Sequence, residues 1–429
     1  MDVALSDYHG ALEYLFARTT GAFKFGLDRT RALLGEMGDP HLRIPTLHIA
    51  GTNGKGSCVA TAEAILGPKG LRVARYTSPH LVDFRERIVV GGEPISPDEV
   101  VEFVHRWTPT IERIGASFFE ATTALAFLHF ARQRADVSLI ETGLGGRLDA
   151  TNVVAPRAAG VVSIGYDHQD YLGSTLESIA AEKAGIFKRG VPAVIGEPTE
   201  AVARWLADAA RRAGALVVRV VRDETRIDDL SVDESGSSFT LHALGARARV
   251  RTPLAGSHQA ANFAFTLCLL DAAGPPFAAT LDEAAAAASA IRLPGRMHQV
   301  GRWIFDVAHN ADGARALATT LSAIVGEETV TVVLCVLGDK DWRAMLTALR
   351  PIAKRFILTD APTAPASRRW HLQEAADAAA RLGVEARAVP DFDVALREAS
   401  SYAERTLVTG SFHTVGDAMA RLQVSPLSG

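Results

Sequence analysis

Short apolar segments alternate with longer helical patterns along this chain from Pro45 onward. Residues Thr46–Ala50 have the length and apolar character of a buried strand, Ser57–Leu66 follow a helical pattern, and Arg72–Tyr76 are the next strand candidate. A strand, a crossover helix and a second strand make one βαβ unit, in which the two strands lie parallel. Repetition of this pattern predicts an α/β fold with a mostly parallel sheet.

A second α/β series begins after residue 293. Its strand candidates are Trp303–Val307, Thr331–Val336, Phe356–Thr359 and Thr406–Thr409. The first series, before residue 293, continues with the strand candidates Val137–Glu141, Gly160–Ile164 and Val191–Ile195. A polar, β-like region covers residues 223–252. Because 429 residues exceed what one hydrophobic core usually serves, we predict two domains, residues 1–293 and a smaller one over 294–429. The segment 293–296 is the expected hinge.

Composition and charge exclude several classes of protein. The chain carries 45 Lys and Arg against 49 Asp and Glu, a net charge of -4, so no overall positive field draws it to nucleic acid or to an anionic membrane. Cys58, Cys268 and Cys335 lack the spacing of a zinc site or a disulfide framework. Met1 is not followed by a basic, apolar leader, and no segment approaches the ~20 apolar residues of a membrane span. We therefore expect a cytoplasmic protein whose partners are small molecules.

A glycine-rich loop at residues 51–57 lies between the first predicted strand and its helix. Glycines let successive backbone N–H groups point into one concavity, to which the helix N-terminus adds the positive end of its dipole. Lys55 supplies a point charge and the Ser57 hydroxyl can reach Mg²⁺, so the loop predicts a site for a nucleoside triphosphate. A glycine-rich turn that happens to contain a lysine is the alternative. The spacing departs from the common G-x-x-x-x-G-K-[ST] pattern, because Ser57 comes two residues after Lys55. Residues 143–146 are also glycine-rich but fail the dinucleotide-binding spacing, since Leu148 stands where the third glycine belongs.

Several separated motifs together resemble one family. They are residues 51–57 (GTNGKGS), 77–81 (TSPHL) with Glu86 and Arg87, 141–152 (ETGLGGRLDATN), 167–168 (DH), 182–186 (EKAGI), 293–296 (LPGR), 305–310 (FDVAHN) and 410–415 (GSFHTV). In these motifs the chain is similar to the bacterial bifunctional dihydrofolate synthase/folylpolyglutamate synthases, ATP-dependent amide ligases related to the Mur ligases of cell-wall synthesis. The resemblance implies an N-terminal P-loop ATPase domain, like the central domain of Mur ligases, and a smaller, Rossmann-like C-terminal domain.

The resemblance also implies a metal site and a modified lysine. Ser78, Glu141 and His168 match the family's Mg²⁺ ligands, and a carboxylate that ends an apolar strand, as Glu141 does, is costly to bury unless it is paired or coordinated. The alternatives are a helix cap for Ser78, a structural ion pair for Glu141 and a hydrogen-bonded loop position for His168. Lys183, in a helix expected over Glu177–Lys188, matches a carbamylated lysine that would help to hold Mg²⁺. A solvated helix lysine is the alternative here, and K⁺ is a further candidate ion.

Other matched positions divide between nucleotide and substrate. The nucleotide contacts implied are Thr52, Asn53, Gly54, Lys55, Gly56, Ser57, Asn262, Arg296 and Asp306. His309 is implied to position the incoming amino acid or the reacting phosphate. The pterin-binding part of the family is matched by Phe119, Glu120, Leu148, Asp149 and Ala150. Such residues suit a pterin, because an aromatic ring can stack on a flat heterocycle and a carboxylate can accept hydrogen bonds from its amino groups. Core packing is the alternative for Phe118 and Phe119, and residues 24–29 resemble the segment that leads into this site.

Together these features predict an ATP- and Mg²⁺-dependent ligase that joins a folate-type carboxylate to L-glutamate through an acyl phosphate. The carboxylate substrate is dihydropteroate, a tetrahydrofolate polyglutamate or both, and the catalytic residues are Lys55, Lys183 and His309. A Mur-type ligase for another carboxylate and a nucleotide-binding switch are the alternatives. The switch would need a base-reading N-K-x-D motif, and the nearest match, residues 338–341, lacks the Asn. The family resemblance implies a monomer.

Overall fold

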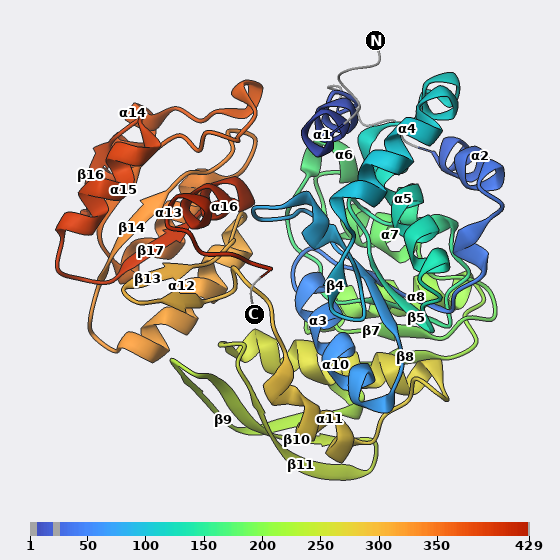
Figure 1. The fold of residues 1–429 in the computed structure, drawn as a ribbon. Coiled ribbons are helices and arrows are strands. Elements are labelled where there is room, and N and C mark those ends of the chain that lie inside the picture. Colours follow the sequence, from blue (N-terminus) through green and yellow to red (C-terminus); the bar gives the residue numbers. More distant parts are fainter. Residues whose placement is uncertain (1–6, 20–25, 428–429) are drawn as a thin grey trace.

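The computed structural model describes residues 7–19 and 26–427, which form two α/β lobes and a small β-sheet beneath the first lobe (Figure 1). Lys24 and Phe25, in the segment expected to lead into the pterin site, lie outside the described residues, whereas Asp28 begins helix α2 (Asp28–Glu36). Within the described part of the chain, no helix is both long enough and apolar enough to cross a membrane.

Eight strands form the sheet of the first lobe, in the order β4-β3-β2-β5-β1-β6-β7-β8. The strands from β2 to β8 in this order run parallel, and the β3–β4 hairpin adds two antiparallel strands at one edge. The bounds are β1 Thr46–Ala50, β2 Val73–Tyr76, β3 Ile88–Val90, β4 Glu93–Pro94, β5 Val137–Glu141, β6 Ala158–Val161, β7 Ala193–Ile195 and β8 Val218–Val220. From β1 the chain crosses to β2 on one side, and from β6 it continues to β7 on the other. The carboxyl ends of β1 and β6 therefore flank a topological switch point, where ligands bind in open α/β sheets.

Helices cover both faces of this sheet. One face packs on α3, α10 and α11 through a core that includes Leu47, Ile49 and Phe265. The other face packs on α1, α4 and α5 at one end and on α7 and α8 at the other. The bounds are α1 Tyr8–Phe16, α3 Lys55–Leu66, α4 Pro97–Ile114, α5 Phe118–Arg132, α6 Gln169–Leu172, α7 Leu176–Ala184, α8 Glu200–Arg212, α9 Val221–Glu224, α10 Ser257–Ala273 and α11 Leu281–Ala287.

The β-like region predicted over residues 223–252 is a three-stranded antiparallel sheet. Its strands are β9 Arg226–Asp233, β10 Gly236–Ala243 and β11 Ala246–Thr252. Phe239 of β10 meets Phe263 of α10 with ring centroids 5.9 Å apart, so the small sheet shares the core of the first lobe.

A second sheet, in the order β12-β13-β17-β14-β15-β16, forms the centre of the second lobe. Its strands are parallel except β12, and they comprise β12 His298–Val300, β13 Trp303–Phe305, β14 Val330–Leu334, β15 Ala353–Leu358, β16 Glu385–Ala388 and β17 Thr406–Thr409. The helices around it are α12 Ala311–Val325, α13 Trp342–Leu349, α14 Leu372–Arg381, α15 Phe392–Ser401 and α16 Phe412–Arg421. Leu293 packs against the core of the first lobe and Met297 against that of the second, so we propose the domain boundary at residues 293/294.

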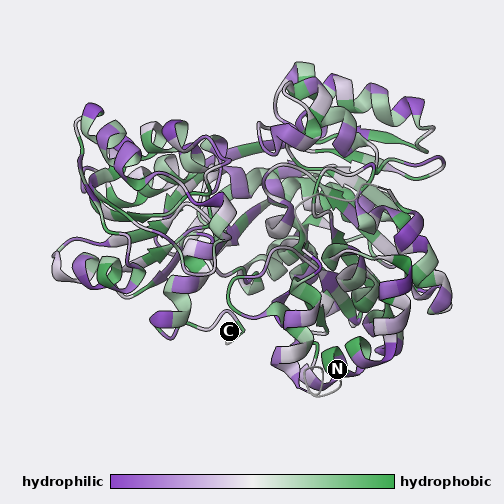
Figure 2. Ribbon diagram, turned by 90° about the horizontal axis from the view of Figure 1, so that it is seen from above, coloured by the Kyte–Doolittle hydropathy of each residue, from purple (hydrophilic) through white to green (hydrophobic). Residues whose placement is uncertain are grey.

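The two-domain α/β fold predicted from the sequence is confirmed. Purple, hydrophilic residues lie on the outer helices, while green residues run along the strands (Figure 2). Three strands have the predicted bounds: Thr46–Ala50, Val137–Glu141 and Thr406–Thr409. The helix predicted over Glu177–Lys188 was too long, because α7 ends at Ala184. The next residue, Gly185, packs so closely that an added Cβ would lie 2.3 Å from the Arg147 Cβ. The short strands β8, β12 and β16 were not predicted; each lies at an edge of its sheet, and none is fully buried.

Candidate functional site

The glycine-rich loop leaves β1 at the carboxyl edge of the first sheet and enters α3, which begins at Lys55 rather than at the predicted Ser57. Gly54 occupies the N-cap position with φ +87°, and no side chain caps the helix. The first N–H groups of an α-helix have no acceptor within the helix. Those of α3 therefore remain available to an anion, as expected of a phosphate cradle.

Residues that follow β6 brace this loop. The N–H of Thr52 donates to the Ser163 carbonyl at 2.8 Å, and the N–H of Asn53 donates to Ser163 Oγ at 3.1 Å. The Gly165 N–H in turn donates to Thr52 Oγ1 at 2.9 Å. The predicted strand over Gly160–Ile164 is therefore wrong beyond Val161, because the chain leaves the sheet there to hold the loop.

Two lysine ammonium groups converge on one carbonyl of the loop. Lys55 Nζ and Lys183 Nζ each donate to the Gly51 oxygen at 3.0 Å, and Lys55 Nζ also donates to the Thr52 oxygen at 3.3 Å. Lys183 is only 5% exposed. Burial, together with the positive charge of Lys55, lowers the pKa of Lys183 to about 7. The solvated helix lysine considered from the sequence is therefore wrong.

Gly54→Ala tests whether the loop conformation is required. An added Cβ would lie 2.7 Å from Asn262 Oδ1 and 2.9 Å from a Val162 methyl group, in a backbone conformation that L-residues rarely adopt. We expect a loss of about 1–3 kcal/mol in the free energy of unfolding and at least a tenfold weaker affinity for ADP, measured by denaturation and calorimetry. Gly35→Ala, in α2 with open space around it, is the matched control; it should leave ADP affinity unchanged and should not lower the free energy of unfolding. Unchanged ADP affinity in Gly54→Ala would contradict the prediction that the loop at residues 51–57 binds the phosphates.

Glu141 and Ser78 lie together beside the first turn of α3. A Cβ on Gly56 would be 3.7 Å from Glu141 Oε2, and Glu141 Oε1 is 3.7 Å from Lys55 Nζ. The backbone N–H of Ser78 acts on the same carboxylate and lowers its pKa. Burial raises the pKa of Glu141, and the charges of Lys55 and Arg296 oppose that rise.

These hard oxygen donors suit Mg²⁺ at the edge of a phosphate cradle. The described residues contain no group of three or more His, Cys, Asp or Glu side chains that could hold a metal ion by themselves. That agrees with the usual habit of Mg²⁺, which takes one or two carboxylates and completes its shell with phosphates and water. The residues present therefore fit an ion shared with a nucleotide.

His168 occupies a different part of the site. It stands at the N-cap of α6 with φ +52°, and its Nε2 is 3.9 Å from Asp167 Oδ1. Burial lowers the pKa of His168 to about 4, and the charge of Lys183 adds to that effect. Among the contacts of the described residues, no hydrogen bond or ion pair joins His168 to Glu141 or Ser78. The structure therefore brings two of the three predicted metal ligands together.

The second domain reaches the loop through Asp167 and Asn53. Lys340 Nζ forms an ion pair with Asp167, His309 Nε2 lies 3.4 Å from Asp167 Oδ2, and Asn310 Nδ2 donates to the same oxygen at 3.3 Å. The side-chain amides of Asn310 and Asn53 also exchange hydrogen bonds of 3.1 and 3.3 Å. Although burial opposes it, the hydrogen bond and charge of His309, with the charges of His168 and Lys340, hold the pKa of Asp167 well below its usual range.

Asp167, Asn310 and Lys340 were absent from the predicted site residues. Each stands in the loop that follows the carboxyl end of a parallel strand, β6, β13 or β14 respectively. Position after a strand was therefore the signal that could have found them.

The predicted nucleotide residues lie around the same edge. Asn262 is placed against Gly54, as the short distance to a Cβ there shows. Both oxygens of Asp306 accept backbone N–H groups, from Met297 at 3.0 Å and Ala308 at 2.9 Å. The Arg296 guanidinium lies 5.4 Å from the centroid of the Phe412 ring, and its charge acts on Asp306 and Glu141.

The residues matched to the pterin site have mixed environments. Phe119 is half-buried near Gly143, where a Cβ would be 2.4 Å from the ring, whereas Phe118 is buried in the core. Glu120 caps α5 through the Ser117 N–H and forms an ion pair of 3.0 Å with Arg29.

Asp149 has a structural role within its own loop. Its oxygens accept the N–H groups of Leu144 at 2.8 Å and Thr151 at 3.0 Å, and so hold the turn that starts at Ala150. Ala150 is buried and Leu148 half-buried. Both carboxylate oxygens of Asp149 are therefore engaged within its own loop.

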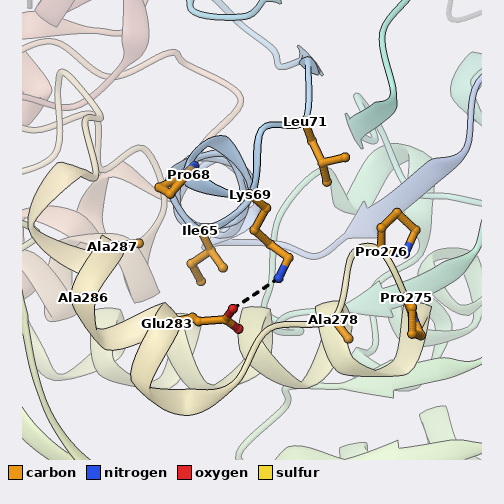
Figure 3. Close-up of a pocket in the computed structure, with 10 residues that line it drawn as sticks. All are labelled: Ile65, Pro68, Lys69, Leu71, Pro275, Pro276, Ala278, Glu283, Ala286 and Ala287. Atoms are coloured by element: carbon orange, nitrogen blue, oxygen red, sulfur yellow. Dashed lines mark ion pairs between the residues drawn. The ribbon is translucent and has the colours of Figure 1, made fainter.

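A surface cavity of about 750 Å³ lies at the opposite end of α3 from the loop (Figure 3). Its lining is mostly apolar, and Lys69 and Glu283 form an ion pair of 3.5 Å across it. Because Lys69 follows the C-terminus of α3, this cavity is separate from the candidate site.

Helix α16 of the second domain touches the segment that carries Ser78. A Cβ on Gly416 would lie 1.9 Å from the Leu81 carbonyl oxygen, so Gly416→Ala must push the two domains apart. Because a displacement of about 1 Å can cost about 10²-fold in rate, we expect kcat to fall 10- to 100-fold while ADP affinity changes less than threefold. Steady-state kinetics and calorimetry measure both. Ala420→Ser, on the exposed side of α16, is the control and should retain activity. Full activity in Gly416→Ala would show that this contact is dispensable.

Fold and site together define an ATP-dependent amide ligase of the Mur type. The Mur ligase middle domain matches residues 49–270, and the Mur ligase glutamate ligase domain matches residues 295–412.

The relatives narrow this class. A dihydrofolate synthase/folylpolyglutamate synthase of Bacillus subtilis (strain 168) is 32% identical over 430 residues, covering 97% of this chain and 99% of its own. Folylpolyglutamate synthase of Mycobacterium tuberculosis, solved with ADP and AMPPCP, has a TM-score of 0.89 at 33% identity, covering 98% of this chain and all of its own. A bifunctional folylpolyglutamate synthase/dihydrofolate synthase solved with Mn, AMPPNP and L-glutamate has a TM-score of 0.84 at 32% identity, covering 98% and 99%. The chain belongs to the dihydrofolate synthase/folylpolyglutamate synthase family, as its motifs predicted.

Proposed function

We propose that this chain is an ATP- and Mg²⁺-dependent ligase that joins the carboxylate of a folate-type substrate to the α-amino group of L-glutamate. The observation that carries the proposal is the phosphate cradle at residues 51–57, with Glu141 against the first turn of α3 and Asn310 of the second domain bonded to Asn53. This arrangement supports a nucleotide gripped between two domains. The related structure that holds AMPPNP, Mn and L-glutamate supports the same set of ligands.

A carboxylate does not lose oxide unaided, which is why the reaction consumes ATP. An oxygen of the acceptor carboxylate attacks the γ-phosphorus, the bond to the β–γ bridging oxygen breaks, and ADP leaves an acyl phosphate behind. The uncharged amine of glutamate then attacks the acyl carbon. The carbon–oxygen bond to the phosphate breaks, inorganic phosphate leaves, and the nitrogen loses a proton to complete the amide.

The residues of this chain position these groups and balance their charges. We propose that Thr52, Asn53, Gly54, Lys55, Gly56 and Ser57 hold the phosphates, with Asn262, Arg296 and Asp306 completing the nucleotide site. Ser78, Glu141 and His168 would hold Mg²⁺, which neutralises phosphate charge when bound.

His309 is proposed to orient the incoming amino acid or the reacting phosphate. Its Nδ1 donates to the Val307 carbonyl at 2.9 Å, and its Nε2 faces Asp167, so both ring nitrogens point at oxygen. Lys340, paired with the same carboxylate, adds a cation on the second domain.

The folate-type acceptor is supported by family membership and by the half-buried Phe119 near Glu120. The assay that tests it offers dihydropteroate, a tetrahydrofolate polyglutamate or a UDP-sugar peptide precursor with labelled glutamate and ATP. We expect label in one or both folate-type products and phosphate release only when both substrates are present. Label in the UDP-sugar product alone would contradict the proposal. Complementation of a strain that lacks dihydrofolate synthase separates the two folate activities.

Lys183 is proposed to be carbamylated. CO₂ reacts with the neutral amine, and the pKa of Lys183, lowered to about 7, makes that form abundant at neutral pH, whereas an ordinary lysine stays charged up to about pH 10. We therefore expect the carbamate signal in ¹³C NMR with labelled bicarbonate to rise as pH increases through about 7. Lys183→Arg should remove the signal and lower kcat at least tenfold, whereas Lys188→Arg should keep both. A signal that survives Lys183→Arg would contradict this assignment.

A monomeric state, a cytoplasmic location and a K⁺ ion beside Mg²⁺ complete the proposal. Size-exclusion chromatography with light scattering tests the first of these. The dependence of the rate on K⁺ against Na⁺ tests the last.

A further inference from the structure

Arg87 is a buried cation beside the candidate site, and no step of the proposed reaction uses it. It is 7% exposed, and a guanidinium in such surroundings is costly unless it is paired. Within the described residues, no carboxylate lies at ion-pair distance from it. Arg85, two positions earlier, shows the ordinary arrangement, with an ion pair of 2.7 Å to Asp83.

Among the residues that the structure describes, the Arg87 side chain forms one hydrogen bond, and this bond leaves the charge of the guanidinium uncompensated. Its Nε donates to His80 Nδ1 at 2.7 Å. A ring nitrogen that accepts this hydrogen bond bears no proton, and a histidine side chain supplies no negative charge to balance the guanidinium. His80 therefore holds the arginine in place and takes only one of its N–H donors.

The position of Arg87 links the two halves of the proposed site. Its carbonyl accepts the Thr77 N–H at 3.1 Å, which places it next to Ser78, and the charge of Glu141 acts on its guanidinium. On the other side, the guanidinium carbon lies 5.3 Å from the centroid of the Phe118 ring.

Phe118 itself belongs to an aromatic cluster. Its ring stacks on Phe16 at 5.2 Å and meets Phe84 edge-on at 6.4 Å. Arg87 therefore stands between this cluster, on the pterin side, and the carboxylate proposed to hold Mg²⁺.

We propose that the Arg87 guanidinium binds the reacting carboxylate of the folate-type acceptor and holds it toward the phosphate cradle. The inference rests on the proposed function and names the residue that recognises its acid substrate. A planar guanidinium suits a carboxylate, since two parallel N–H···O bonds can form. The acceptor carboxylate must also approach a triphosphate, which is negatively charged as well. The ammonium group of Lys55 is already bonded to the loop and lies near Glu141. Arg87 supplies the second cation that this approach requires.

The test compares an acid with its neutral isostere. Binding of 7,8-dihydropteroate and of its carboxamide is measured by fluorescence titration in the presence of ADP. We expect the unaltered chain to bind the acid at least tenfold more tightly. In Arg87→Gln the acid should lose at least tenfold in affinity while the carboxamide changes less than twofold, so the preference disappears. Arg87→Lys should keep part of the preference, and Arg85→Gln, the matched control, all of it.

Kinetics give a second reading. In Arg87→Gln the kcat/KM for the acceptor should fall at least 100-fold while the KM for ATP changes less than twofold. Equal weakening of acid and carboxamide would assign Arg87 a merely structural role and overturn the inference, as would an unaltered chain without acid preference. The latter result stands even if Arg87→Gln does not fold. The labelled-glutamate assay on the unaltered chain judges the proposed function separately, because amide formation without acid preference rejects only the role of Arg87.

Discussion

Lys55→Ala is expected to lower kcat by about 10³-fold, the largest single effect of any substitution in this chain. Lys55 Nζ lies on the loop carbonyls of Gly51 and Thr52 and 3.7 Å from Glu141, where it would meet the phosphates. Its removal leaves the transferred phosphoryl group without its nearest fixed charge. It also deprives the buried Glu141 carboxylate of its ion-pair partner.

Phosphate release and labelled-glutamate incorporation measure this loss, and ADP calorimetry shows how much of it is binding. Lys69→Ala is the matched control, because Lys69 lies at the other end of α3 and, among the described residues, its ion pair is with the surface residue Glu283. It should retain full activity. If Lys55→Ala condensed glutamate at the unaltered rate, the ligase mechanism derived from this loop would have to be abandoned.

Glu141→Gln is expected to lower the rate about 10²-fold at ordinary Mg²⁺ concentration and to raise the half-saturating Mg²⁺ concentration at least tenfold. Gln keeps the shape of the side chain and an acceptor for the Ser78 N–H, but it removes the negative charge that faces the first turn of α3. The loss should therefore appear in metal dependence more than in folding.

Titration of Mn²⁺ in the presence of AMPPNP, followed by electron paramagnetic resonance, measures the metal directly. Glu63→Gln is the control, since Glu63 is a partly buried carboxylate of α3. It forms an ion pair of 3.0 Å with Arg75. It should leave Mn²⁺ affinity unchanged. Unaltered Mn²⁺ affinity in Glu141→Gln would assign Glu141 to a purely structural ion pair with Lys55.

Sequence reasoning succeeded where the signal was local. The apolar run Val137–Glu141 predicted a buried strand with a carboxylate at its end, and the structure has both. The loop at residues 51–57 predicted a helix N-terminus, and α3 begins inside the loop; the phosphate site there stays a prediction.

Errors arose where a long-range contact decided the local structure. The strand β6 ends at Val161 because the next residues brace a loop more than 100 positions earlier. Similarly, α7 ends at Ala184 because Gly185 packs against Arg147. No periodicity within either segment reports those contacts.

By itself, the sequence determined the α/β class and the glycine-rich loop that enters α3, because apolar periodicity and glycine spacing record which groups a short segment must bury or expose. The resemblance of its separated motifs indicated the family. Only the tertiary structure decided which distant residues meet. It joined Asp167 to Lys340 and Asn310, placed Lys183 beside Lys55, and left Arg87 buried with no carboxylate of the described residues at ion-pair distance. Strand order and domain docking set those distances, and both follow from the free energy of burying whole faces against one another, which no single segment contains.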